Sequence, residues 1–123
     1  MKKLLLGVLI AFLAVSLGGF AAAKGQKQAA LAAPTNLKLM IVPNGFKLSW
    51  KPAPGASSVA VTGYEIFRAD LASGPFTPVA KVDRGVFQYI DTTASREIIY
   101  YYKVRAVSEA ETSPDSNTVI GER

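Results

Sequence analysis

One stretch, residues 100–107, constrains the fold more than any other part of this chain. Its even-numbered positions carry side chains that run from aromatic to small, namely Tyr100, Tyr102, Val104 and Ala106. The odd-numbered positions between them are Tyr101, Lys103 and Arg105. Because successive side chains of a strand point to opposite faces, this pattern predicts one packed face and one solvent face. A strand of this kind is typical of an antiparallel sheet.

The rest of the chain after residue 35 is also predicted to form strands. Together with residues 98–107, we expect strands at 36–41, 46–51, 64–67, 76–82, 86–91 and 117–120. In the first of these, Leu37, Leu39 and Ile41 are expected to share one face. Pro78 favours an edge position for its strand, because proline has no amide hydrogen for the ladder. Short strands separated by turn signals predict an antiparallel β-sandwich.

The first 23 residues have the layout of a secretory signal peptide. A positive start is followed by an uncharged apolar run and then by small residues that end at Ala23. We expect cleavage after Ala23 and a secreted or periplasmic protein, which meets the membrane only transiently. The alternative is an uncleaved anchor, since residues 4–23 are long enough to span a bilayer. Residues 24–33 are expected to be a flexible leader, and residues 34–121 the folded domain.

Composition excludes several kinds of chemistry. The chain has no cysteine and no histidine, so disulfides, thiol nucleophiles, imidazole bases and the usual zinc ligand sets are absent. Removing Lys2 and Lys3 with the signal peptide lowers the Lys+Arg total from 14 to 12 against 9 acids, a net charge of +3. This charge is too weak to indicate nucleic acid as a partner. The part before Glu65 contains no acid, which predicts either a solvated basic surface or attraction to anionic envelope polymers.

Several motifs in order resemble a fibronectin type III domain of bacterial extracellular proteins. They are Leu48-Ser49-Trp50, Gly63-Tyr64-Glu65-Ile66-Phe67-Arg68, Gly74-Pro75-Phe76, Tyr89-Ile90-Asp91-Thr92, the 100–107 stretch and Ser113-Pro114-Asp115-Ser116-Asn117. The resemblance implies an immunoglobulin-like sandwich of seven strands in two sheets, A-B-E and C-C′-F-G. It also implies that Trp50 fills the core and that the Tyr100 hydroxyl bonds a backbone carbonyl across the E–F connection. The core is therefore expected to contain Trp50, Tyr64, Ile66, Tyr100, Tyr102, Val104 and Ala106.

No motif predicts a catalytic, cofactor or metal site, so binding is the expected function. If Tyr64 and Ile66 face inward, Phe67 faces outward, and by the same parity Tyr101 faces outward on its own strand. The resemblance implies that these two strands, C and F, are neighbours. The expected interaction surface is Phe67, Tyr101, Lys103 and Arg105. We expect a non-catalytic interaction or spacer domain whose partner is a protein or a cell-envelope polysaccharide. Two alternatives remain: a carbohydrate-binding accessory protein that uses Phe67 and Tyr101, and a small carboxylate-dependent hydrolase.

Overall fold

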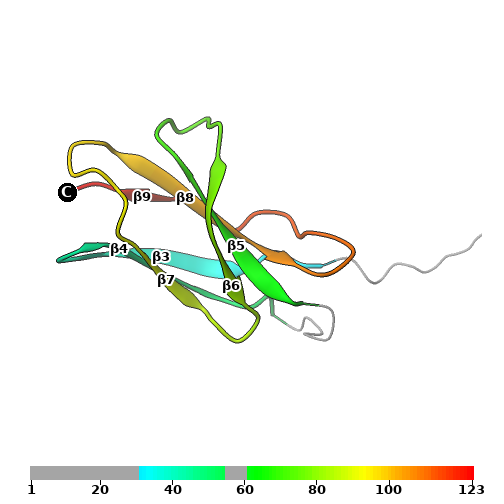
Figure 1. Ribbon diagram of the computed structural model, residues 1–123. Coiled ribbons are helices and arrows are strands. Elements are labelled where there is room, and N and C mark those ends of the chain that lie inside the picture. Colours follow the sequence, from blue (N-terminus) through cyan, green and yellow to red (C-terminus); the bar gives the residue numbers. More distant parts are fainter. Residues whose placement is uncertain (1–30, 55–60) are drawn as a thin grey trace, which may run out of the picture. The chain divides into compact units, whose positions relative to one another are not determined.

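The computed structural model describes residues 31–54 and 61–123, which form two antiparallel sheets (Figure 1). The seven strands are β3 (Thr35–Val42), β4 (Gly45–Lys51), β5 (Gly63–Ala69), β6 (Thr77–Asp83), β7 (Gln88–Asp91), β8 (Tyr100–Val107) and β9 (Val119–Gly121). The three-stranded sheet has the order β3-β4-β7, and the four-stranded sheet has the order β6-β5-β8-β9. This is the predicted seven-stranded sandwich with the predicted division into two sheets, and the fold prediction is confirmed.

The core lies between the two sheets and is built around aromatic rings. All seven residues predicted for the core are buried, with Trp50 4% exposed and Ile66, Tyr102 and Val104 fully covered. The ring of Trp50 meets Tyr64 edge-on at 5.7 Å, and Phe46 meets Tyr102 at 6.1 Å, both favourable aromatic geometries. Leu31 is 8% exposed and belongs to the same cluster. The packed unit therefore begins at Leu31, three residues before the expected domain boundary.

Burial along β3 decreases toward the hairpin turn. Leu37 is 2% exposed and Leu39 is partly buried, but Ile41 is 54% exposed. A Cβ added at Gly121, the last residue of β9, would meet the side chains of Leu39 and Phe46. Ile41 lies further along β3, beside the hairpin turn, where the opposite sheet does not cover it. The alternation of Leu37, Leu39 and Ile41 therefore predicts their shared side of β3 but not how deeply each one is buried.

Gly45 begins β4 at a point where another strand comes very close. A Cβ added at Gly45 would collide with the backbone carbonyl oxygen of Asp91, on the paired strand β7. Only glycine allows this approach. The Pro43-Asn44-Gly45 sequence is typical of a tight turn, but the close contact with β7 depends on the tertiary structure.

Pro78 lies on β6, which is the edge strand of its sheet, as predicted. The register between β5 and β6 shifts between Ile66 and Phe67, which pair with Ala80 and Pro78 respectively. Val79 is thus the extra residue of a β-bulge. Pro78 has no amide hydrogen to donate to a neighbouring strand. An edge strand tolerates this, because it has a neighbour on one side only.

Serine side chains replace a strand along part of β8. The short β9 pairs only with residues 100–102 of β8. Beyond them, the hydroxyl groups of Ser116 and Ser113 accept hydrogen bonds from the amides of Val104 and Ala106, at 2.9 and 2.8 Å. Pro114 prevents a regular ladder here, so the two hydroxyl groups satisfy amides that a continuous strand would pair.

Asn117 joins the two sheets through its side-chain amide. Its Oδ1 accepts a hydrogen bond from the Leu37 amide, and its Nδ2 donates one to the Leu37 carbonyl, both at 3.0 Å. Leu37 follows Asn36, whose φ of 57° lies in the left-handed region, and the β3–β4 register shifts between Thr35 and Lys38. This irregularity frees the backbone groups of Leu37 for Asn117.

Candidate interaction surface

The outer face of β5 and β8 carries most of the residues predicted to form an interaction surface. The two strands pair so that Phe67 lies opposite Lys103 and Glu65 lies opposite Arg105. These four side chains point away from the core, because their neighbours Ile66 and Val104 point into it. All four are partly exposed. Strand parity therefore brings three of the four predicted residues together.

An open hollow of about 200 Å³ lies over this face. It is lined by Phe67, Phe76, Lys103, Arg105 and Asp115. Phe76 comes from the connection between β5 and β6, and Asp115 from the segment before β9. Neither residue was predicted for this surface: Phe76 was expected within a strand at 76–82 but precedes β6, and Asp115 lies in a segment without alternating polarity.

Cations cover the aromatic rings of this surface. The guanidinium carbon of Arg105 lies 4.6 Å from the ring centre of Phe67, and Lys103 Nζ lies 4.2 Å from that of Phe76. Arg105 Nε also donates a hydrogen bond to Glu65 Oε1 at 2.8 Å, and Lys103 Nζ lies 3.5 Å from Asp115 Oδ2. Each cation thus contacts a ring and a carboxylate, which holds its side chain in place.

Tyr101 has the same outward parity as Lys103 and Arg105 on β8. It lies opposite Ala69 on β5 and Ile120 on β9, and it is not among the residues that line the hollow. Phe67 and Tyr101 both face outward on the paired strands β5 and β8, but Phe67 stacks with Arg105 while Tyr101 lies beside β9.

Tyr100 differs in detail from the implied tyrosine corner. Its hydroxyl oxygen accepts a hydrogen bond from the amide of Ser95, at 3.1 Å, in the connection between β7 and β8. The expected carbonyl partner is therefore wrong, although the bond does span the expected connection. The ring is buried, and the guanidinium of Arg68 lies over it at 4.6 Å.

A buried carboxylate was missed by the sequence reasoning. Asp91 has no exposed surface and receives hydrogen bonds from Tyr102 Oη, Arg68 Nη1 and Thr93, whose amide and hydroxyl both donate. Burial raises the pKa of the Asp91 carboxyl, but the hydrogen bonds from Thr93, Tyr102 and Arg68 outweigh it and hold the pKa below its ordinary value. Burial, and then the bond to Asp91, raises the pKa of Tyr102. The one available signal was parity, since Asp91 shares the inward face of β7 with Tyr89.

The surroundings of Asp91 suit a structural role rather than catalysis, because a substrate cannot reach the buried carboxylate. Its partner Arg68 is 23% exposed on β5, and the carboxylate itself is closed to solvent.

Among the described residues, no three acidic side chains gather where they would hold a metal ion. The described ranges also contain no helix that is long and apolar enough to cross a membrane. The predicted signal peptide and residues 24–30 of the predicted leader lie outside those ranges.

Comparison with known proteins places similar segments in much longer chains. No family model matches the sequence. Over 72 residues, which are 58% of this chain, it is 42% identical to an amylopullulanase from Thermoanaerobacter thermohydrosulfuricus. It is 38% identical over 72 residues to another amylopullulanase, from Thermoanaerobacterium thermosulfurigenes. The matched segments make up 5% and 4% of those proteins.

Among solved structures, an Fn3-like protein from Clostridium thermocellum matches nearly end to end. The two chains are 31% identical with a TM-score of 0.64, and the match covers 75% of this chain and 92% of that one. A β-1,2-glucanase from Parabacteroides distasonis contains a similar segment, with 28% identity and a TM-score of 0.63. That match covers 76% of this chain and 13% of the glucanase.

Proposed function

Since this chain belongs to the fibronectin type III-like (Fn3-like) proteins, we propose that it is a non-catalytic, exported domain that binds another protein at the cell envelope. One observation carries the non-catalytic part of the proposal. The segment that resembles this chain is about 5% of an amylopullulanase, whereas it is nearly all of an Fn3-like protein. A domain of this size that is found both within a much longer enzyme and as nearly a whole chain is suited to an accessory role.

The outer face of β5 and β8 supports a protein partner. It alternates charges of both signs around two aromatic rings, with Glu65 and Asp115 beside Arg105 and Lys103. A partner with the complementary charge pattern would gain both attraction and a defined orientation. The rings and the alkyl parts of the cations add apolar contact area at the centre.

Carbohydrate binding is the second candidate, and the similarity to amylopullulanases favours it. A sugar ring needs an accessible aromatic face, and in this structure Arg105 lies over Phe67. Binding at Phe67 would require Arg105 to move from the ring while its bond to Glu65 is kept or exchanged. A carboxylate-dependent hydrolase is the weakest candidate, because Glu65, Asp91 and Asp115 all contact cations.

Native gel electrophoresis with pullulan or amylopectin in the gel separates the two binding functions. A protein-binding domain migrates as in a gel without polysaccharide, and it releases no reducing sugar from either polymer. Retardation that is lost in Phe67→Ala, and kept in Tyr101→Ala, would replace the proposal with carbohydrate binding at the hollow. Release of reducing sugar that disappears on a single Asp→Asn or Glu→Gln change would overturn the non-catalytic assignment.

Export is tested on the native protein. Mass spectrometry of the protein recovered outside the cytoplasm should give a chain that begins at Lys24. A membrane-associated chain that still begins at Met1 would instead support the uncleaved anchor.

A further inference from the structure

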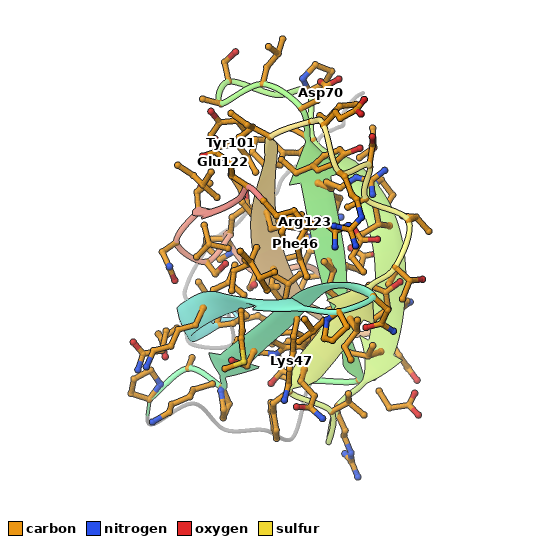
Figure 2. All side chains as sticks on the ribbon, turned by 90° about the vertical axis from the view of Figure 1, so that its left-hand side faces the viewer. Phe46, Lys47, Asp70, Tyr101, Glu122 and Arg123 are labelled. Carbon is orange, nitrogen blue, oxygen red and sulfur yellow. The ribbon has the colours of Figure 1, made fainter. Side chains whose placement is uncertain are left out.

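The outer face of the three-stranded sheet carries lysines on two adjacent strands. Lys38 on β3 lies opposite Ser49 on β4, and Lys47 and Lys51 lie two residues to either side of Ser49. All three lysines alternate with buried residues, so they point away from the core. Figure 2 shows this directly for β4, where Phe46 lies within the sandwich and Lys47 lies on the far side of the strand.

No carboxylate balances these charges on the strands that form the face. The residues of β3 and β4 include no acid, and the one acid of β7, Asp91, points inward and is fully buried. Within the described ranges, the ion pairs involve other cations, namely Arg68, Lys103 and Arg105. The two sheets therefore present different outer faces, one with paired charges and one with positive charge only.

The spacing of the lysines suits a long anion rather than a small one. Diagonal neighbours on adjacent strands lie roughly 7–8 Å apart, so Lys38 is near both Lys47 and Lys51 without sharing a contact point with either. Lysine ammonium groups on flexible stems act as point charges and do not impose a fixed two-bond geometry. A polymer with repeated negative charges would contact all three at once and would relieve their mutual repulsion.

Two apolar side chains complete the face. Met40 and Ile90 lie opposite Lys47 on its two sides, in one row across β3, β4 and β7. They are 62% and 39% exposed. This row is too small for insertion into a bilayer, which needs a much larger apolar face. It gives an extended polymer a flat strip against which its uncharged parts can pack.

We propose that the outer face of β3, β4 and β7 binds an extended anionic polysaccharide through Lys38, Lys47 and Lys51. The site is on the opposite sheet from the hollow at Phe67 and goes beyond the proposed protein-binding function. Both faces can be occupied together, so that the domain would hold a protein partner against an anionic polymer.

The test is binding of the full exported chain to polygalacturonate, measured by native gel electrophoresis with the polymer in the gel. Neutral pullulan and vesicles of mixed neutral and anionic phospholipid are run in parallel. The variant Lys38→Gln/Lys47→Gln is compared with Lys81→Gln/Arg96→Gln, which removes the same charge from exposed residues on other elements. Circular dichroism of each variant establishes that the sandwich is intact.

The expected result is retardation by polygalacturonate, weakened roughly tenfold or more in Lys38→Gln/Lys47→Gln and much less in the matched control. Raising the salt concentration should abolish the binding, because screening shortens the reach of exposed charges. Equal losses in both variants would show attraction to net charge alone and would overturn the site. Absence of retardation, or binding to the vesicles in place of the polymer, would also overturn it. None of these outcomes bears on the hollow at Phe67, whose own test uses neutral polymers.

Discussion

The hydroxyl group of Tyr102 donates a 2.6 Å hydrogen bond to the carboxylate of Asp91, and this bond joins β8 of one sheet to β7 of the other. Arg68, on β5, donates to the same carboxylate oxygen at 2.9 Å. Both β5 and β8 are thereby attached to the opposite sheet through one buried charge. An ionised carboxylate without these donors would be very costly in such a place, so the three side chains depend on one another.

Removing the charge of Asp91 should destabilise the fold. We expect Asp91→Asn to lower the free energy of unfolding by about 3 kcal/mol or more, because Arg68 and Tyr102 lose an ionised acceptor. Tyr102→Phe should cost about 2 kcal/mol, since one donor to the carboxylate is lost. Urea unfolding followed by tryptophan fluorescence gives both values. Asp70→Asn is the control, because Asp70 is exposed at the end of β5 (Figure 2), and a similar loss there would contradict the assignment.

Stability should fall in acid through the same carboxyl group. The pKa of Asp91 is lower in the folded protein than its ordinary value of about 3.9. Its stabilisation is therefore complete above the unfolded pKa and is lost as the pH falls through the folded pKa. Urea midpoints measured from pH 7 to pH 2 should decline below about pH 4, and more steeply for the native chain than for Asp91→Asn. Parallel curves for the two proteins would show that Asp91 has no such role.

Gly45 should not tolerate a side chain. In Gly45→Ala the new methyl group meets the carbonyl of Asp91, so β4 and β7 must separate, at a cost of about 1–3 kcal/mol. Gly85 offers a matched control, because a Cβ added there meets nothing within 4 Å. Gly85→Ala is expected to change the free energy of unfolding by less than about 0.5 kcal/mol. Thermal unfolding of the two variants should separate them clearly, and equal melting temperatures would contradict the close approach.

Asn117 should contribute more to stability than its exposed position suggests. Asn117→Ala removes both hydrogen bonds to Leu37 and should lower the free energy of unfolding by about 1–3 kcal/mol. The neighbouring exposed residue Thr118 provides the control, with an expected change within about 0.5 kcal/mol for Thr118→Ala. Amide hydrogen exchange at Leu37 should also accelerate in Asn117→Ala. Unchanged exchange there would show that the side chain does not hold β3.

The ion pair of Arg105 and Glu65 should add little stability. Both side chains are partly exposed, at 32% and 22%, so water and salt screen their attraction. A double-mutant cycle with Glu65→Gln and Arg105→Gln should give a coupling energy of about 1 kcal/mol or less. A coupling of several kcal/mol would assign this face to the stability of the sheet and would weaken its role in binding.

Alternation of side chains was sufficient to predict the strands and an antiparallel sandwich, and the resemblance to fibronectin type III domains supplied the division into two sheets and the core position of Trp50. Burial of Tyr102, Val104 and Ala106 follows from their shared parity, which is a property of the local chain. The edge position of Pro78 also follows locally, from the amide hydrogen that proline lacks. Parity likewise predicted that Phe67, Lys103 and Arg105 face outward, and the resemblance implied that their strands are neighbours.

What the sequence by itself determined, then, is which side chains face inward along each strand, because that depends on a period of two residues. The division of the strands into two layers was predicted through the resemblance to a known family. Only the tertiary structure decided which distant groups meet: Arg68, Asp91 and Tyr102 in the core, Phe76 and Asp115 beside Phe67, and Asn117 against Leu37. Those contacts depend on strand register, on a bulge and on where each strand ends. A few ångströms of displacement between strands would change every one of them without changing the alternation.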